Sequence, residues 1–478
     1  MGTLYVSIIF LIFKVSLLSE LDYDTILKGI KPSKQEHEGV MKLSEDLVNL
    51  INETASELGV EVEAALVGSV SKGTWLSGNA DIDILMKFPL DTSTNLLKKY
   101  GLEIGHETIK KMEGVAEERY ASHPYVTGYI NNYYVDFVPC YDIKSYKELK
   151  SAVDRTLLHT KYIQANLTPK QEDEVVLLKK FMECVGTYGS EFKVGGFSGY
   201  LCELMILQYG SFEETIKNAA LNWSYGHTID LMNYQTGGNF KDPLVAVDPV
   251  DPNRNVAAAL TLQKMSEFVV AAANFQQEPK ESYFKQKTHE MDEKILKELF
   301  NNRKTRTILI TFKPPSIPAD AVYPQIKKTE HSIVRMVESE GFEVFGSASW
   351  TDEINEAVIL IEFEVWELPV LKKHLGPKIW IREHQKRFLE KYPDNAWIEE
   401  DRWVVGIPRE YTQVLNLLSD LMTGKKSGYL KFGKHLKKRI MADHQILDIE
   451  TILNSQSNTP GIIKFLYEYL HPGDKIFR

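Results

Sequence analysis

Two aspartates interrupt an apolar segment in the first hundred residues of the chain. In the run ADIDILMKF, Asp81 and Asp83 are separated by a single residue, and the alternate positions are apolar: Ile82, Ile84 and Met86. Because successive side chains of a strand point to opposite faces, this pattern predicts a strand with both carboxylates on one face and the apolar residues in the core. Carboxylates next to a core are costly unless something neutralises them. The pattern therefore favours a bound cation, although a pair of surface-facing strand residues would give the same spacing.

A third carboxylate follows on a later predicted strand. The segments YVTGYI and YYVDFVPCY, joined by Asn131 and Asn132, are typical of a β-hairpin whose second strand carries Asp136. Adjacent strands could bring Asp136 to Asp81 and Asp83. Three carboxylates are hard oxygen ligands that suit Mg²⁺, and two such ions suit phosphoryl or nucleotidyl transfer.

A small-residue turn precedes the aspartate strand. Gly68 and Ser69 stand after the predicted strand EVEAALV and at the expected start of a helix, where backbone N–H groups and a hydroxyl can hold phosphate oxygens. Lys72 could neutralise part of a triphosphate. Each of these signals is weak alone, but their order along the chain makes a nucleotide site the more specific interpretation.

The length of 478 residues predicts about three domains. We expect an α+β protein with an apolar extension over 1–30, a catalytic head over 31–150, a helical central domain over 151–265 and a C-terminal region over 266–478. In the last region, strand, helix, strand and strand patterns follow one another, which favours a ferredoxin-like module. The segment DPVDPNRNVAAAL is expected to be a Pro-rich loop that enters a helix.

Charge and cysteine usage narrow the class of protein. The net charge is −10, yet seven basic residues gather near the C-terminus without an acid among them: Lys425, Lys426, Lys431, Lys434, Lys437, Lys438 and Arg439. Such a cluster is either a solvated surface or a local nucleic-acid contact. The three isolated cysteines, Cys140, Cys184 and Cys202, favour a reducing cytoplasm over a disulfide framework or a zinc site.

The first residues are the only membrane-like feature. The apolar run from Leu4 to Phe13 is broken by Lys14 and is shorter than the ~20 residues that a spanning helix needs. We expect a small docking segment or an upstream start codon and no stable membrane association. Membrane attachment through residues 4–18 remains the alternative.

The motifs together resemble one family. GSVSKGTWLSGNADIDILMKFP, VDFVPCY, SAVDRTLLHTKYI, VVLLKKFMECVGTYGSEF, GFSGYLCELMILQYGSF and DPVDPNRNVAAAL occur in the order seen in archaeal (class I) CCA-adding enzymes. These are tRNA nucleotidyltransferases of the polymerase-β superfamily. The resemblance continues through HLGPKIWIREHQKRF and DRWVVGIPRE and covers nearly all of the chain from about residue 30. It implies a polymerase-β-like head, a helical neck, and a body and tail that contain an RRM-like module.

The resemblance also implies roles for particular residues. Asp81, Asp83 and Asp136 would be catalytic and would hold Mg²⁺, with two ions expected. The residues that would bind the nucleotide are Ser69, Lys72, His159, Lys179, Tyr188 and Arg254. Asp81 stands where many members have a glutamate. Lys72 stands where many have an arginine; the lysine keeps the positive charge but loses the bidentate hydrogen bonding of the guanidinium. The adjacent Lys180 is an alternative to Lys179 for this nucleotide-binding role.

Arg254 matches an arginine that reads the edge of the incoming base in this family. Its alternative is an arginine at a helix start, paired with Asp248 or Asp251. His159 and Tyr188 could equally be core residues, and Lys179 a solvated one, if they were considered without the family.

The implied reaction adds C, C and A to the 3′ end of tRNA without a nucleic-acid template, from CTP and ATP, and releases pyrophosphate. The C-terminal module and the basic cluster would contact the acceptor and T arms, and the enzyme would be a homodimer in the cytoplasm. Two alternatives remain: a poly(A)-polymerase-like or other nucleotidyltransferase, and an inactive RNA-binding relative.

Overall fold

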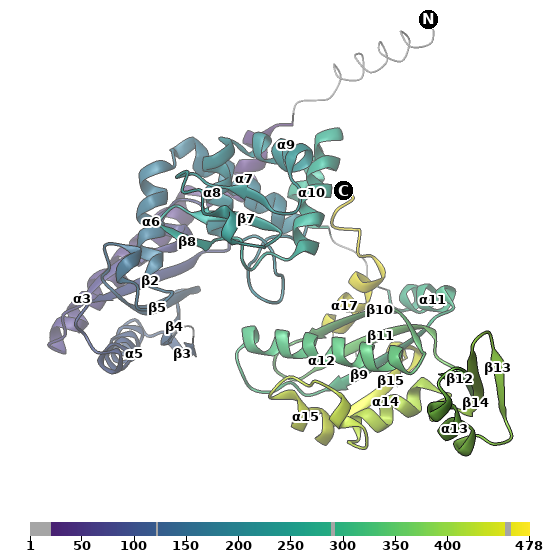
Figure 1. Cartoon of the computed structure of the whole chain (residues 1–478). Helices are drawn as coiled ribbons and strands as arrows, with labels where there is room; N and C mark the ends of the chain where they lie inside the picture. Colours follow the sequence, from purple (N-terminus) through teal and green to yellow (C-terminus); the bar gives the residue numbers. More distant parts are fainter. Residues whose placement is uncertain (1–20, 121–122, 288–291, 455–459) are drawn as a thin grey trace, which may run out of the picture. The chain divides into compact units, whose positions relative to one another are not determined.

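The computed structural model describes residues 21–120, 123–287, 292–454 and 460–478 (Figure 1). The chain forms two compact units. Unit 1 comprises Met1–Thr288 together with Gly473–Arg478, and unit 2 comprises His289–Pro472. Across the described ranges, no helix is long and apolar enough to cross a bilayer. The apolar run that raised the question of membrane attachment lies outside the described residues.

The first part of unit 1 is built on a mixed five-stranded sheet. Its strands lie in the order β1-β2-β5-β4-β3, and only β2 and β5 run parallel. Helices α3 (Lys34–Glu57) and α5 (Thr94–Lys111) pack on this sheet and on each other. The strands are β1 (Glu63–Val67), β2 (Asp81–Phe88), β3 (Val115–Tyr120), β4 (Pro124–Ile130) and β5 (Tyr133–Tyr141).

Local sequence signals explain the ends of these elements. The Ser33 hydroxyl accepts a hydrogen bond from Glu36 N and so caps α3. The predicted hairpin is confirmed, since Asn131 and Asn132 connect β4 to β5 with φ values of 50° and 69°. Asparagine tolerates this left-handed region, which the two-residue turn between antiparallel strands requires.

Helices dominate the second part of unit 1, which surrounds a core rich in aromatic side chains. These helices are α2 (Tyr23–Ile30), α6 (Arg155–Asn166), α7 (Pro169–Cys184), α8 (Gly199–Tyr209), α9 (Phe212–Asn222) and α10 (Leu262–Gln277). The ring of Phe181 on α7 lies within 5.7 Å of those of Phe212, Phe275 and Tyr283. Thr168 and Gln171 form the capping box that starts α7.

Three short strands complete this part: β6 (His227–Ile229), β7 (Leu244–Asp248) and β8 (Asp251–Asn255). The expectation of a Pro-rich loop over residues 248–260 is therefore wrong at its start. The Asn255 side chain stabilises the strand pair, because its amide accepts from Ala246 N and donates to Leu244 O. Arg254 consequently lies on a strand, not at a helix start.

The six residues Gly473–Arg478 return to unit 1 after the chain has formed unit 2. Arg478 donates hydrogen bonds to the carbonyl oxygens of Cys184 and Lys285. The Tyr283 hydroxyl donates to Ile476 O, and the Ile476 side chain packs against the aromatic core. This segment therefore belongs to the packing of the helical part.

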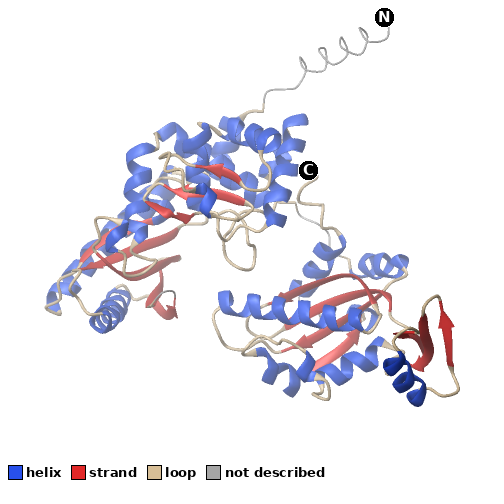
Figure 2. Cartoon of the chain, in the orientation of Figure 1, coloured by secondary structure: helices blue, strands red, loops and turns tan. Residues whose placement is uncertain are grey.

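Unit 2 contains the predicted strand–helix–strand–strand module. Its sheet has the antiparallel order β10-β11-β9-β15, so β11 lies between β9 and β10, which is the ferredoxin-like arrangement. Figure 2 shows helices on both faces of this sheet. One face is covered by α12 (Ala319–Ser339), α14 (Val414–Met422) and α15 (Leu436–Ala442), and the other by α11 (Glu293–Arg303), α16 (Ile449–Leu453) and α17 (Pro460–Leu470).

The central strands of this module are nearly continuous apolar runs because both of their faces are covered. They are β9 (Arg306–Phe312) and β11 (Ala357–Val365), flanked by β10 (Glu343–Thr351) and β15 (His444–Asp448). Between β11 and α14 the chain inserts a small sheet, β12-β14-β13, with one helix. These elements are β12 (Leu371–Lys378), α13 (Arg382–Lys391), β13 (Ala396–Glu399) and β14 (Arg402–Pro408).

Candidate active site

The two strands that carry the predicted carboxylates lie next to each other. In the parallel pair of β2 and β5, Asp83 is directly opposite Asp136, and Asp81 lies two residues before Asp83. Ile82 and Ile84 are fully buried on the other face of β2. The alternation of the sequence thus places Asp81 and Asp83 on one face, and strand pairing adds Asp136.

The carboxylates influence one another electrostatically. Burial and the neighbouring Asp136 and Asp81 carboxylates raise the pKa of Asp83 to about 7, whereas Lys72 acts in the opposite direction. Burial also raises the pKa of Asp81 and of Asp136, and Arg119 opposes this rise in both. Negative charge on these three carboxylates is therefore unfavourable without a cation. Carboxylates that bind a metal ion share this property, because the ion supplies the missing positive charge.

The side chains do not stand in a ready-made coordination geometry. The Thr127 hydroxyl donates a hydrogen bond of 2.6 Å to Asp136 Oδ1. In the part of the chain that the structure describes, no three His, Cys, Asp or Glu side chains converge on a single point suited to a metal ion. The donor set is chemically suited to Mg²⁺, and Asp136 could ligate an ion through Oδ2 while Oδ1 keeps its hydrogen bond from Thr127.

The glycine of the small-residue turn lies directly against the aspartates. Gly68 begins α4 (Gly68–Ser71) and has a φ of 74°, which a side chain rarely tolerates. A β-carbon at this position would lie 2.0 Å from Asp83 Oδ2. Ser69 follows in the same short turn, and its carbonyl oxygen accepts a hydrogen bond from Thr74 N. The turn therefore holds Ser69 beside the carboxylate strand.

Lys72 and Lys179 meet at a buried carboxylate that the sequence did not reveal. Glu203 on α8 accepts hydrogen bonds from Lys72 Nζ at 2.6 Å and from Thr74 Oγ1 at 2.7 Å. Lys179 Nζ lies 3.9 Å from Glu203 Oε1 and donates to the carbonyl oxygen of Thr74 at 2.8 Å. Lys180 instead pairs with Glu183, so Lys179 is the one of the two lysines that reaches this cluster.

Tyr188 and Tyr200 border the same cluster. A β-carbon on Gly199 would lie 3.1 Å from the Tyr188 hydroxyl and 3.3 Å from Lys179 Nζ, so these two groups share one small space. Lys72 Nζ lies 5.9 Å from the centre of the Tyr200 ring. Burial raises the pKa of both tyrosines, which keeps them neutral hydrogen-bond donors.

A second polar cluster centres on Asp248. Its buried carboxylate accepts hydrogen bonds from His159 Nε2 and Arg254 Nη1, both at 2.8 Å, and from the Tyr200 hydroxyl at 3.2 Å. The His159 ring stacks on the Tyr200 ring, with 3.9 Å between their centres. Burial lowers the pKa of His159, although its bond to Asp248 raises it. Arg254 is paired as its alternative interpretation expected, yet its side chain is still one-third exposed.

Tyr200 connects the two clusters, because its ring lies near Lys72 Nζ and its hydroxyl donates to Asp248. Glu203 and Tyr200 are the residues that sequence reasoning missed. Both stand in GFSGYLCEL, a motif that supported the family resemblance but suggested no role for either residue. The signal available in the sequence was a single glutamate among the apolar residues of GYLCELMILQY.

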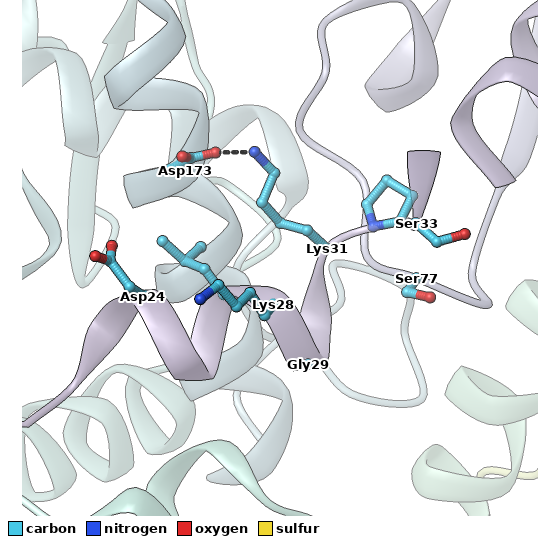
Figure 3. Close-up of a pocket in the computed structure, with 9 residues that line it drawn as sticks. Asp24, Lys28, Gly29, Lys31, Ser33, Ser77 and Asp173 are labelled. Atoms are coloured by element: carbon cyan, nitrogen blue, oxygen red, sulfur yellow. Dashed lines mark hydrogen bonds and ion pairs between the residues drawn. The ribbon is translucent and has the colours of Figure 1, made fainter. Parts of the chain in front are cut away.

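A cavity of about 580 Å³ lies elsewhere in unit 1, beside α2 (Figure 3). Its lining includes Lys31, which pairs with Asp173, and the polar residues Asp24, Ser33 and Ser77. None of its lining residues belongs to the predicted nucleotide or metal site. A second cavity, of about 540 Å³, is lined in part by Arg254 and by the ion pair of Arg155 and Asp251.

Three protein-family models match successive parts of the chain. Residues 48–163 match the "Nucleotidyltransferase domain", residues 173–285 match "tRNA nucleotidyltransferase, second domain" and residues 303–448 match "CCA-adding enzyme, C-terminal domain". The site described above lies within the first two of these matches.

Curated relatives match over nearly the whole length. A protein named "CCA-adding enzyme" from Methanothermobacter thermautotrophicus is 48% identical over 451 residues, which is 94% of this chain and 98% of the relative. Proteins with the same name from Methanosarcina acetivorans and Methanopyrus kandleri are 37% and 33% identical, over 88% and 95% of this chain and 92% and 97% of their own lengths. A solved structure of the Cid1 poly(U) polymerase covers 55% of this chain and 98% of its own, at 14% identity and a TM-score of 0.44, which is too weak for comparison.

Proposed function

The chain belongs to the family of CCA-adding enzymes, and we propose that it carries out the reaction of that family at the carboxylates of β2 and β5. The enzyme adds the 3′-terminal CCA to tRNA without a template, from CTP and ATP. The observation that carries the assignment to this site is the position of Asp83 opposite Asp136 on parallel neighbouring strands. Nucleotidyl transfer in this family depends on a metal ion.

We assign metal binding to Asp81, Asp83 and Asp136, with two Mg²⁺ ions. The raised pKa of Asp83 supports this assignment, because a bound cation would offset the two causes of the rise, which are burial and repulsion by the neighbouring carboxylates. When bound, such ions lower the pKa of an attacking hydroxyl and stabilise charge on a triphosphate. Asp136 is held by Thr127 next to this position and would help to orient the 3′-hydroxyl of the tRNA.

The remaining predicted residues divide into two groups by their surroundings. Ser69, Lys72, Lys179 and Tyr188 would bind the phosphates, since two ammonium groups, a hydroxyl and a neutral phenol gather beside the carboxylates. His159 and Arg254 would contact the base, because Asp248 fixes both and leaves part of the Arg254 guanidinium exposed. Fixed donors of this kind can distinguish cytosine and adenine from other bases by their hydrogen-bonding edges.

Contact with tRNA would fall mainly to unit 2. In the cluster of basic residues 425–439, Lys425 pairs with Asp420 and Lys426 with Glu410. The other five have no acidic neighbour in the sequence between them, and their charge would bind the phosphates of the acceptor and T arms. The inserted sheet β12-β14-β13 and the turn between β12 and α13 add exposed aromatic and aliphatic side chains, among them Trp397 on the sheet and Trp380 in the turn.

Further proposals concern organisation. We propose a catalytic head over 31–150, a nucleotide-binding neck over 151–265 and a tRNA-binding region over 266–478. Separate hydrophobic cores support a head, a neck and unit 2 as distinct parts, although the neck core continues past residue 265 through Phe275 and Tyr283. The three cysteines are buried and unpaired, which supports a cytoplasmic location. We propose a homodimer on the strength of the family resemblance, to be tested by light scattering.

The test uses a tRNA that lacks its 3′-CCA, with Mg²⁺, CTP and ATP, and resolves the products on a sequencing gel. We expect the wild type to add C, C and A and then stop, and Asp83→Ala to lose the activity at least ~1,000-fold. Asp46→Asn, an exposed position on α3, is the matched control and should behave as wild type. A long homopolymer tail would indicate a poly(A)-type enzyme, and tRNA binding without extension would indicate an inactive relative.

A further inference from the structure

Glu203 is a fully buried charged group of the nucleotide site. Its side chain is fully buried, as is that of Lys179 to within 2%, and Lys72 is only 8% exposed. The carboxylate comes from α8, whereas Lys179 comes from α7 and Lys72 from the loop after α4. One carboxylate therefore connects three segments that are distant in the sequence.

The hydrogen bonds around Glu203 leave little freedom for these groups. Each of its oxygens has its own partner: Oε2 accepts from Lys72 Nζ and Oε1 from Thr74 Oγ1. The Thr74 hydroxyl, which donates its hydrogen bond to Glu203, accepts one from Lys179 Nζ at 3.2 Å. Thr74 thus links the Glu203 carboxylate to Lys179 through two hydrogen bonds.

The charges explain why such a carboxylate is needed. Two ammonium groups that are removed from water repel each other, and burial lowers the pKa of Lys179. Glu203 opposes this lowering by its negative charge, while Lys72 adds to it. A neutral residue at position 203 would leave both lysines without a counter-charge in a buried place.

We propose that Glu203 is a positioning residue that holds the ammonium groups of Lys72 and Lys179 next to each other, and thereby sets the affinity of the enzyme for the triphosphate part of its nucleotide substrates. The proposal rests on the phosphate-binding roles proposed above for these two lysines. Glu203 itself does not contact the substrate. Because the base is read at the Asp248 cluster, the effect of Glu203 should be the same for CTP and ATP.

The test compares Glu203→Gln with the wild type in the full-length enzyme. We expect KM for CTP and for ATP to rise at least ~10-fold and by similar factors, with a smaller change in kcat. Equilibrium binding of CTP should weaken by the same factor, whereas binding of CMP, which lacks the outer phosphates, should change less than ~2-fold. The Glu203→Asp variant keeps the charge and should recover part of the lost CTP affinity.

The matched control is Glu362→Gln in unit 2. Glu362 is also fully buried and accepts hydrogen bonds from Arg303, Thr305 and Tyr469. The Glu362→Gln variant measures the general effect of removing a buried carboxylate charge, and it should leave the ratio of CTP to CMP affinity unchanged. An equal loss of CTP and CMP binding in Glu203→Gln would overturn the proposal, as would CTP binding at the wild-type level.

A double-mutant cycle separates this inference from the assignment of the site. If Lys72→Ala and Lys179→Ala bind CTP as well as the wild type, the proposed phosphate site itself is wrong. If these variants lose CTP affinity but Glu203→Gln does not, only the role of Glu203 fails. When Glu203 acts through Lys72, the losses caused by Glu203→Gln and Lys72→Ala should be clearly less than multiplicative in the double variant.

Discussion

The Asp83 carboxylate lies against the α-carbon of Gly68, so that a β-carbon on Gly68 would come within 2.0 Å of Asp83 Oδ2. This contact couples the turn that contains Ser69 to the strand that carries the aspartates. A glycine is required here for two reasons, its positive φ and the absence of space for a side chain. The turn and the carboxylate can therefore be tested together through one substitution.

Gly68→Ala should reduce CCA addition at least ~100-fold, because the added methyl group must displace Asp83 from its position opposite Asp136. Gly59→Ala is the control, since Gly59 has a similar φ of 67° but open space where its β-carbon would lie. The two variants should lose comparable backbone stability, about 1 kcal/mol each. Thermal unfolding would compare the stability losses, and steady-state extension assays would distinguish the two variants. Equal activity of both variants would contradict this explanation.

Asp83→Asn should stabilise the metal-free protein at alkaline pH. The folded state raises the pKa of Asp83 to about 7 from its ordinary value of 3.8, so between these values the folded protein binds more protons than the unfolded chain. The free energy of unfolding of the wild type therefore falls as the pH rises through this range, and the cost is fully present above pH 7. The asparagine variant does not titrate and escapes this loss.

Urea unfolding in EDTA at pH 5 and pH 8 would measure the effect. The advantage of Asp83→Asn over wild type should be larger at pH 8 than at pH 5. Addition of Mg²⁺ at pH 8 should raise the stability of the wild type and leave the variant nearly unchanged, because only the wild type keeps all three carboxylates. A variant that is less stable than wild type at pH 8 without metal would refute the electrostatic argument.

Asp248→Asn should weaken base selection. The substitution removes the negative charge that holds His159 and Arg254, and the amide that replaces it is a poorer acceptor for both. We expect the incorporation of UTP relative to CTP to rise about 10-fold, which corresponds to ~1.4 kcal/mol of lost discrimination. Competition between labelled nucleotides would measure this ratio. A uniform loss of affinity for all nucleotides would instead assign Asp248 a structural role.

Ile476→Ala should destabilise unit 1, because Ile476 packs on the aromatic core and the carbonyl oxygen of this residue accepts from Tyr283. We expect a loss of about 1–2 kcal/mol, which lowers the melting temperature by roughly 2–8 °C. Phe477→Ala is the control, since the Phe477 side chain is 66% exposed. Equal melting temperatures for the two variants would show that the segment contributes little to the core.

Short-range patterns predicted much of the structure. Alternation in ADIDILMKF determined which face of β2 carries Asp81 and Asp83, and two asparagines determined the turn between β4 and β5. The strand–helix–strand–strand order of β9, α12, β10 and β11 in unit 2 was also predicted, because each of these elements has its own periodicity. These features depend on neighbours in the sequence, and so the sequence displays them directly.

Contacts between distant segments were the part that the sequence could not reveal. Glu203 acquires its place only when α8 packs beside α7 and the loop after α4, and no local pattern encodes that packing. The strand β8 was missed because prolines surround it, whereas the Asn255 side chain supplies the hydrogen bonds that stabilise it. The choice between Lys179 and Lys180 likewise required the direction of each side chain around α7.

The return of Gly473–Arg478 to unit 1 has a consequence for synthesis on the ribosome. These residues leave the exit tunnel only after all of His289–Pro472 has been made, so the helical part of unit 1 must wait for its last packing contacts. A translation product that stops within unit 2 lacks both those contacts and part of the tRNA-binding region. Completion of the catalytic unit is thereby linked to translation of the whole chain.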